Sequence, residues 1–423
     1  MNAISRTIER LAIDQRTLAT LLGLTAQKSS QIERWETGKE TIPDRILQKL
    51  NYLPNTIAYK SDYVGEFNFI DLFAGIGGIR LPFQKYGGKC LFTSEWDKYS
   101  QITYAANFGE VPEKDGDVTA FRNHEIPKHD ILLAGFPCQA FSQAGKRAGF
   151  YDTRGTMFFE IQRIIAHHQP KAFLLENVKQ LKGHDGGRTL KTILAILRGE
   201  NIPQLPDDVP MSDEARNALS LDCRYNVDFA VLRARDFGVP QTRERIYIVG
   251  FNKDKVSAAN QENIVKEMFE RIGRKTHPQK KLQEALEEDS ENTKSYTISD
   301  RLWAGHIRRK AKHKANGNGF GYSLFTKESD YCNTISARYY KDGSEILIEQ
   351  PGFNPRKLTP REAANIQGFP ENFYIGAVSD TQVYRQFGNS VAVPVIDAIA
   401  QEMLPILGVG LEPKKRMKGK KIE

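Results

Sequence analysis

The stretch FNFIDLFAGIGG, residues 67–78, runs from an apolar segment directly into a cluster of glycines. Apolar residues on both faces predict a strand that is buried on both sides. Glycines let the backbone turn sharply and approach a ligand closely. A strand that leads through such a turn into a helix is typical of nucleotide-binding α/β folds. Because the stretch is not G-x-G-x-x-G and lacks the lysine of a P-loop, it is a weak signal alone.

Four more apolar segments are typical of buried strands. They are GGKCLFTSEW (87–96), HDILLAGF (129–136), KAFLLEN (171–177) and RIYIVGF (245–251). Since helical stretches separate them, we predict a parallel sheet with helices on both faces. The segments assign residues 56–252 to a Rossmann-like α/β domain.

The composition is that of a globular protein with two or three domains. The chain has 423 residues, 40% of them hydrophobic and 26% charged, and its net charge is +8. This charge permits a nucleic-acid partner without demanding one. We find no apolar run of 18 residues and no secretory signal, so no membrane association is expected. The four cysteines lie far apart, which favours a cytoplasmic protein without disulfides or a zinc site.

Residues 1–55 have the pattern of a separate all-α unit. Leu18 and Leu21 recur at helical spacing, Gly23 interrupts the pattern, and a second helix is predicted to include Trp35. A helix, a glycine turn and a second helix resemble the helix-turn-helix of phage repressors. The second helix would present polar side chains to phosphates or base edges, namely Gln27, Lys28 and Ser30. The alternative is an interaction module that binds no DNA.

Beyond the α/β segments the sequence changes character. Residues 253–379 are polar, basic and glycine-rich, and they predict a second, less regular domain. A strand-and-helix element around residues 386–404 follows, and residues 380–408 are expected to complete the α/β domain. The basic tail, residues 409–423, is expected to be disordered.

Two acidic residues follow the glycine cluster at the spacing of a nucleoside site. Glu95 ends the next predicted strand, 20 residues after Gly75, and can accept hydrogen bonds from both ribose hydroxyls. Trp96 can pack on an adenine. Asp117 lies where we expect a further strand to end, and it could contact the adenine amino group. Either acid alone could be a solvated loop carboxylate, but the combination favours a cofactor such as S-adenosylmethionine.

Catalytic candidates lie at the ends of two predicted strands and at the start of a third. Cys138, in AGFPCQAFS, comes directly after an apolar strand, at the edge where parallel sheets bind ligands. Its thiolate would be the reactive form, although an isolated cysteine is more often a small buried hydrophobe. Glu176 ends the next strand at the same crevice. Arg243 and Arg245 stand at i and i+2, so their side chains point to one side of an extended segment; the alternative is a solvent-facing charged edge.

Nine ordered blocks resemble the cytosine-C5 DNA methyltransferase family, of the bacterial type II restriction-modification kind. They are DLFAGIGGIR, SEWDKYS, GDVT, GFPCQAFS, RGTMFFEIQR, ENV, QTRERIYIVGF, RKLTPREAANIQGFP and QFGNSVAVPV, within residues 67–251 and 353–403. The resemblance implies transfer of a methyl group from S-adenosylmethionine to C5 of a cytosine flipped out of duplex DNA. A transfer-RNA cytosine methyltransferase is one alternative, and a transcription regulator with a methyltransferase-like body is another.

The resemblance implies a role for each candidate. Cys138 corresponds to the nucleophile that adds to C6 of cytosine, and Glu176 to the acid that binds N3 and the exocyclic amine. Arg243 and Arg245 correspond to arginines that position the base and that glutamate, and no metal is implied. The cofactor-contacting positions of the family fall on Phe73, Gly75, Gly77, Glu95, Trp96, Asp117, Pro137, Asn389, Ser390 and Val391.

The resemblance also places DNA contacts in two segments. The family's loop that closes over the flipped base corresponds to the segment with Gln139, Ser142, Lys146 and Arg147. The target-reading piece corresponds to the segment with Thr334, Ser336, Arg338, Tyr339 and Lys341. It is similar to members that recognise CCGG or a longer site containing it, with arginine reading guanine and the lysines at 310, 312 and 314 holding phosphates.

The assembly expected from the sequence is simple. One flipped base needs one active site, so we expect a monomer in catalysis. The amino-terminal unit could dimerise on an operator, and one hypothesis is that it represses the enzyme's own operon.

Overall fold

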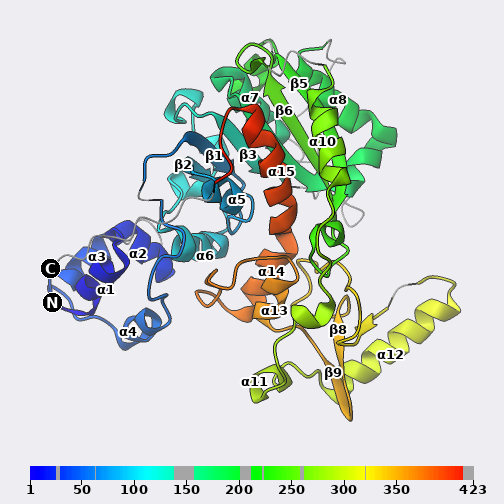
Figure 1. Ribbon diagram of the computed structural model, residues 1–423. Helices are drawn as coiled ribbons and strands as arrows, with labels where there is room; N and C mark the ends of the chain where they lie inside the picture. Colours follow the sequence, from blue (N-terminus) through cyan, green and yellow to red (C-terminus); the bar gives the residue numbers. More distant parts are fainter. Residues whose placement is uncertain are drawn as a thin grey trace.

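Helices and strands form three groups in the computed structural model (Figure 1). The described residues are 1–24, 29–61, 63–137, 157–200, 211–221, 223–257, 262–319 and 321–412. A large sheet with its covering helices forms the upper body in Figure 1, a smaller sheet lies below it, and a small helical unit lies to the left. Within the described ranges, every helix is too short or too polar to span a bilayer.

The large sheet has six strands in the order β2-β1-β3-β4-β6-β5. The strands are β1 (Phe67–Leu72), β2 (Gly88–Ser94), β3 (Ile131–Gly135), β4 (Ala172–Val178), β5 (Tyr225–Arg233) and β6 (Glu244–Asn252). The strands β1–β4 run parallel to one another, as the apolar segments predicted. β6 runs antiparallel to both β4 and β5, so the prediction of a parallel strand was wrong for RIYIVGF.

A short connection explains the reversed strand. Only residues 234–243 join β5 to β6, and they include the 3-10 helix η7 (Ala234–Phe237). A parallel pair needs a crossover of a dozen or more residues, usually with a full helix, so this connection leads to antiparallel pairing.

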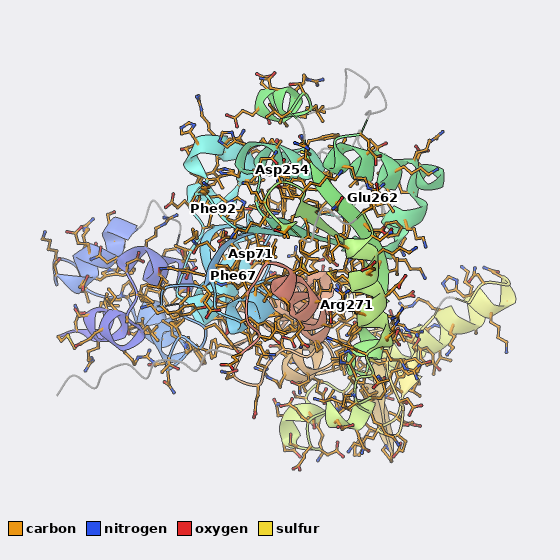
Figure 2. All side chains as sticks on the ribbon, turned by 45° about the horizontal axis from the view of Figure 1, so that its top comes forward. Phe67, Asp71, Phe92, Asp254, Glu262 and Arg271 are labelled. Atoms are coloured by element: carbon orange, nitrogen blue, oxygen red, sulfur yellow. The ribbon has the colours of Figure 1, made fainter. Side chains whose placement is uncertain are left out.

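Helices cover both faces of the sheet. On one face pack α5 (Arg80–Lys85), α10 (Ile264–Arg274) and α15 (Val393–Ile406); on the other pack α7 (Met157–His168), α8 (Arg188–Arg198) and α9 (Asp213–Ala218). Strand β3 serves both layers, because Ile131 and Leu133 point into the first and Leu132 and Ala134 into the second. Figure 2 shows the dense side-chain packing around Phe67 and Asp71 of β1.

The amino-terminal helices pack directly on the α/β body. They are α1 (Ala3–Leu11), α2 (Gln15–Leu21), α3 (Ser29–Glu36) and α4 (Asp44–Asn51). Their apolar core includes Ala105 and Ala106 of helix α6 (Lys98–Phe108). Arg16 of α2 also donates a hydrogen bond of 2.6 Å to the carbonyl of Pro112. The unit therefore shares its core with the α/β domain.

The lower region combines a small sheet with short helices. Its elements are β7 (Leu324–Phe325), β8 (Leu347–Gln350), β9 (Phe353–Arg356), α11 (Glu291–Lys294), α12 (Asp300–Ala315), α13 (Pro360–Asn365) and α14 (Asp380–Asn389). The remaining 3-10 helices of the described chain are η2 (Lys114–Gly116), η3 (Val118–Ala120), η4 (Asn123–Glu125), η6 (Lys179–Gly187) and η9 (Leu282–Glu284). One apolar cluster joins this region to Ile76 and Phe108 of the α/β domain.

Two sequence predictions about the carboxyl-terminal part were wrong. The expected strand-and-helix element is a pair of helices, α14 and α15, because Pro394 favours the first turn of a helix. The tail also does not leave the body at residue 409, since Val409 and Leu411 still pack against the apolar cluster around α15. Residues 413–423 lie outside the described part of the chain.

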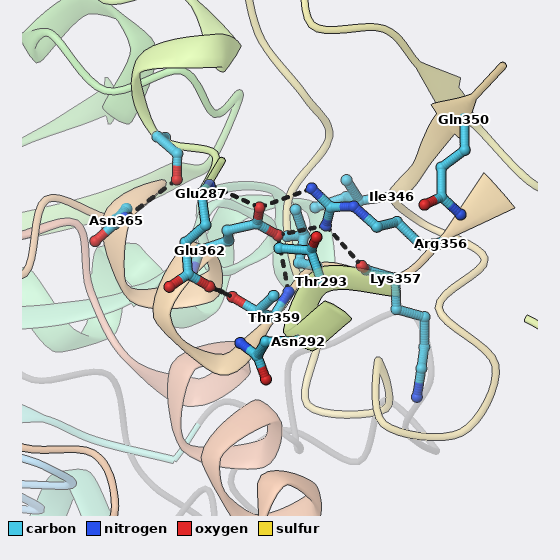
Figure 3. Close-up of polar contacts among 12 residues, drawn as sticks. Glu287, Asn292, Thr293, Ile346, Gln350, Arg356, Lys357, Thr359, Glu362 and Asn365 are labelled. Atoms are coloured by element: carbon cyan, nitrogen blue, oxygen red, sulfur yellow. Dashed lines mark hydrogen bonds and ion pairs between the residues drawn. The ribbon is translucent and has the colours of Figure 1, made fainter. Parts of the chain in front are cut away.

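A buried ion pair organises the lower region (Figure 3). The guanidinium of Arg356 donates two hydrogen bonds, of 2.7 and 2.8 Å, to the carboxylate of Glu362, and both side chains are buried. The same carboxylate accepts the backbone N–H groups of Glu287 and Thr359 at 2.9 and 2.8 Å. Four donors thus satisfy one buried carboxylate and fasten β9 to the start of α13.

Replacing Arg356 by Met should lower the free energy of unfolding by about 3–5 kcal/mol, because Glu362 would keep a buried charge without its cation. Urea unfolding followed by circular dichroism measures this change. The matched control is Arg356→Met combined with Glu362→Leu, which removes both charges and should recover most of the loss. A single variant as stable as the wild type would contradict a structural role for the pair.

Candidate active site

A tight turn follows β1 at the carboxyl edge of the sheet. Phe73, Gly75 and Gly77 all have positive φ, at +54°, +58° and +85°. The N–H of Phe73 donates to Oγ of Ser94 at 3.2 Å, which holds the turn against the end of β2. A Cβ on Gly77 would lie 2.3 Å from the ring of Phe108, so this position requires glycine. A Cβ on Gly75 would meet no atom within 4 Å, which leaves the turn open at that point.

Glu95 fixes the conformation of this turn. Its carboxylate accepts the N–H of Gly75 at 2.7 Å and the N–H of Asp97 at 2.8 Å. Burial raises the pKa of Glu95 to about 7, although these backbone hydrogen bonds favour the ionised form. The neighbouring Trp96 is 75% exposed, so its indole face is available to a planar ligand.

Gly116 brings the segment with Asp117 against Glu95. Its φ is +78°, and a Cβ there would lie only 1.8 Å from the carbonyl oxygen of Glu95. Asp117 is exposed and caps η3 by accepting the N–H of Thr119 at 2.9 Å. The expected strand before Asp117 is absent from the described chain, where η2 and η3 stand instead. The three proposed cofactor contacts, Glu95, Trp96 and Asp117, therefore do come together.

Gln101 is a site residue that the sequence did not single out. Its side-chain amide donates to the carbonyls of Glu95 and Asp115, at 2.6 and 3.0 Å, and so joins the two segments that carry the acids. A glutamine on the first turns of a helix gives no sequence signal for this contact, because the partner carbonyls lie in two separate segments.

The segment after α14 packs against the glycine turn. A Cβ on Gly78 would lie 3.0 Å from Oγ of Ser390 and 2.9 Å from a methyl carbon of Val391. Asn389, at the end of α14, directly precedes them. The three carboxyl-terminal residues proposed for the cofactor thus lie beside the turn that contains Gly75 and Gly77.

Glu176 lies at the end of β4, beside Gly135 of β3. Its carboxylate is 3.1 Å from Nε of Arg245, and both side chains are largely buried. Burial raises the pKa of Glu176 despite the opposing charges of Arg245 and Arg243. The side chain of Asn177 donates to the carbonyl of Phe136 at 3.3 Å, which holds the end of β4 against the residues that lead to Pro137.

The buried guanidinium of Arg243 donates hydrogen bonds to backbone carbonyls of two other segments. The acceptors are the carbonyls of Ile335 at 3.3 Å, Gly388 at 3.1 Å and Ser390. These carbonyls belong to the target-reading segment and to the segment beside the glycine turn. Arg245 forms the ion pair with Glu176, and the charge of Arg243 also opposes the effect of burial on the pKa of that carboxyl.

Asp71 is a further carboxyl with a raised pKa near the turn. It lies in β1, two residues before Phe73, and its carboxylate is fully buried without a hydrogen-bond partner among the described residues. Burial raises the pKa of Asp71 to about 7. Near neutral pH this carboxyl is therefore partly protonated.

The target-reading segment divides into exposed and buried side chains. Arg338 and Lys341 are exposed, Thr334 is half-buried, and Ser336 donates its hydroxyl hydrogen bond to Glu345. Tyr339 is fully buried, and its hydroxyl donates to the carbonyl of Ile346 at 2.7 Å and accepts the N–H of Leu358 at 2.8 Å. The prediction that Tyr339 contacts DNA was therefore wrong.

Apart from the lysines of α12, only Ser30 of the remaining predicted DNA-binding and catalytic residues lies in the described part of the chain, where it is exposed on α3. The others lie outside the described residues, namely Gln27, Lys28, Cys138, Gln139, Ser142, Lys146 and Arg147.

Comparison with known proteins identifies relatives along most of the chain. The family model described as C-5 cytosine-specific DNA methylase matches residues 67–201 and 212–405. Type II methyltransferase M1.ScrFI of Lactococcus lactis subsp. cremoris is 51% identical over 402 residues, covering 94% of this chain and 93% of that protein. Type II methyltransferase M.HpaII of Haemophilus parainfluenzae is 44% identical over 360 residues, covering 81% and 90%.

Solved structures share the fold. The Dnmt2 methyltransferase of S. pombe aligns with a TM-score of 0.59 at 18% identity, covering 81% of this chain and 99% of that one. The chain belongs to the C-5 cytosine-specific DNA methylase family and is a DNA cytosine methyltransferase.

Proposed function

We propose that this enzyme methylates a specific cytosine in duplex DNA through a covalent bond between Cys138 and C6 of a flipped-out base. The observation that carries the proposal is Glu176, a buried carboxyl with a raised pKa that is held by Arg245. It pairs with Gly135 of β3, three residues before Cys138 in the sequence. The acid and its orienting cation lie at the carboxyl edge of the sheet, where we propose that the nucleophile acts.

The proposed chemistry begins with the thiolate of Cys138, which adds to C6 and makes C5 nucleophilic. Glu176 stabilises this adduct by giving its proton to N3 and by binding the exocyclic amine. Its raised pKa supports this role, because a carboxyl that keeps its proton closer to neutral pH can donate it. S-adenosylmethionine supplies the methyl group when it is bound. Removal of the proton from C5 returns the electron pair to the C5–C6 bond and expels the thiolate of Cys138.

The residues around the glycine turn fit S-adenosylmethionine. Glu95 would accept the ribose hydroxyls, the exposed face of Trp96 would stack on the adenine, and Asp117 would accept the adenine amino group. The open side of Gly75 leaves room for the methionine part, because a side chain there is absent. The remaining contacts would come from Phe73, Gly77, Pro137, Asn389, Ser390 and Val391.

The proposed target is CCGG or a longer site that contains it. Arg338 and Lys341 support this assignment, because both are exposed and neither has an ion-pair partner in the part of the chain that the structure describes. Arginine matches the O6 and N7 acceptors of guanine in the major groove. Thr334 and Ser336 lie in the same segment and would add further contacts to the DNA.

We propose that a monomer catalyses the reaction, because one flipped cytosine needs one active site.

A second proposed function is control of transcription by residues 1–55. The helices α2 and α3 enclose a turn at Gly23, whose φ is +71°, and Ser30 is exposed on α3. This arrangement supports a helix-turn-helix that binds an operator, with two copies on a two-fold-symmetric site.

Expression in a host without 5-methylcytosine, followed by mapping of that base at single-nucleotide resolution, tests the target and the nucleophile together. The wild type should methylate one consensus that contains CCGG. Cys138→Ser should leave the genome unmethylated, because a hydroxyl is a far weaker nucleophile than a thiolate. A consensus in which CC and GG are separated by other base pairs would contradict the proposed target, and full methylation by Cys138→Ser would exclude the covalent adduct.

The affinity for S-adenosylmethionine should increase as the pH rises from 6 to 8. The pKa of Glu95 is raised to about 7, so its carboxyl is mostly protonated below this range and becomes a charged acceptor for ribose hydroxyls above it. Titration calorimetry at each pH measures the dissociation constant. Glu95→Gln should bind more weakly and lose most of this pH dependence; an equally steep dependence in that variant would assign the titration to another group.

The triple variant Gln27→Ala, Lys28→Ala, Ser30→Ala should lose binding to the enzyme's own upstream promoter and keep methyl transfer. Substitution is preferable to deletion, because removal of residues 1–55 would expose Ala105 and Ala106 of α6. Band-shift assays on the promoter duplex measure the effect. Arg45→Ala with Gln48→Ala, on the exposed side of α4, is the matched control. Promoter binding retained by the triple variant would exclude the regulatory role.

A further inference from the structure

We propose that helix α12 binds DNA phosphates outside the sequence that the enzyme reads, and so extends its contact with the duplex. This inference deepens the proposed function, since it assigns a second DNA surface to the same enzyme. In Figure 1, α12 projects from the lower region, away from the helices α1–α4 on the opposite side of the molecule. It has 16 residues and is therefore about 24 Å long.

The charge of α12 is concentrated and positive. The helix contains six Lys and Arg residues and one acidic residue, Asp300, whereas the whole chain has a net charge of only +8. Asp300 lies in the first turn and accepts a hydrogen bond of 2.6 Å from Asn354, so it is engaged within the protein. Most of the formal excess of positive charge on the chain thus lies on this helix.

One face of α12 is occupied by the protein. The ring of Trp303 packs edge-on against Tyr322, with 4.7 Å between the centroids, and His306 is buried with Nε2 3.1 Å from the carbonyl of Asp342. Arg309 pairs with the carboxylate of Asp342 at 3.1 Å. On the same face, Lys310 lies 4.1 Å from the ring centroid of Tyr322 and donates to its carbonyl. Lys310 is exposed but engaged with Tyr322, and its role at a phosphate stays a prediction.

The opposite face carries a basic stripe, which we define as Arg301, Arg308 and Lys312. Around the helix, Arg308 and Lys312 lie about 20° to either side of Arg301, so the stripe is only about 40° wide. All three are exposed, and their side chains have no hydrogen-bond or ion-pair partner among the described residues. The stripe lies about 160° around the helix from the middle of the packed face and is free to meet a partner.

The helix dipole does not explain this stripe. Cations in the last turn stabilise a helix, which accounts for Lys312 and Lys314, but Arg301 lies in the first turn, where a positive charge is unfavourable. Arg308 and Lys312 also repel one another at i and i+4. A polyanion would relieve both costs by neutralising the stripe.

Duplex DNA is the polyanion that fits. An amphipathic helix on a lipid surface needs an apolar face, whereas the apolar and aromatic side chains of α12 are mainly used against the protein. The contact to Asp342 joins α12 to the segment that contains the exposed Arg338 and Lys341. A helix of about 24 Å spans roughly seven base pairs at 3.4 Å each. The stripe would therefore follow the backbone beside the target sequence.

The test compares the wild type with the variant Arg301→Gln, Arg308→Gln, Lys312→Gln. The probes are synthetic duplexes of about 12 and 36 base pairs, centred on the consensus found by genome mapping, and fluorescence anisotropy at several salt concentrations gives the dissociation constants. The variant should bind the long duplex at least about tenfold more weakly, and the slope of log K against log salt should fall by about 2.7, at 0.9 per phosphate contact. Its affinity for the short duplex and its methylated sequence should equal those of the wild type.

A control variant removes the same charge elsewhere. It combines Lys128→Gln, Arg224→Gln and Lys253→Gln. These residues lie next to strand ends at the amino edge of the large sheet, opposite the candidate active site. This variant should bind both duplexes like the wild type. Equal affinity of the α12 variant and the wild type for the long duplex would overturn the proposal, as would an equal loss in the control variant. Absence of methyl transfer by the wild type on either duplex would instead count against the proposed function itself.

Discussion

The buried guanidinium of Arg243 links the two parts of the catalytic machinery. It donates to the carbonyl of Ile335 in the target-reading segment and to those of Gly388 and Ser390 beside the cofactor turn. A buried cation costs free energy unless donors and acceptors match, so these carbonyls are held in one arrangement. Gly388 strengthens the constraint, because a Cβ there would lie 2.2 Å from the backbone nitrogen of Ala337. The segment proposed to read DNA and the segment proposed to contact the cofactor thus meet at one junction.

Burial also sets the electrostatics of the site. The pKa values of Asp71, Glu95 and Glu176 are all raised, and desolvation is the main cause in each case. Their partners differ, however: backbone N–H groups stabilise the charge of Glu95, whereas Arg245 stabilises that of Glu176. The same physical effect therefore acts on two carboxyls in different settings, which fits the different roles that we propose for them.

Local sequence pattern predicted what depends on neighbouring residues. The apolar segments gave β1–β4, the glycines gave the turn at Phe73–Gly77, and strand ends gave Glu95 and Glu176. The sequence pattern did not predict features that depend on other segments of the chain. The direction of β6 depends on a short connection, Tyr339 is buried by contacts to Ile346 and Leu358, and Gln101 acts on carbonyls of two other segments. The free face of α12 also follows only from what packs on its other side.

The placement of α15 has a consequence for how the chain folds. This helix, Val393–Ile406, packs in the same apolar cluster as Phe67 and Phe69 of β1, more than 300 residues earlier in the sequence. Contacts between residues so far apart in the sequence form late in folding, because the entropic cost of closing the intervening loop must be overcome first. During synthesis, β1 and its neighbours would leave the ribosome with one face uncovered and aggregation-prone. The α/β domain would therefore become competent only after α15 has been made, which sets a minimum delay between the start of translation and the first methylated cytosine.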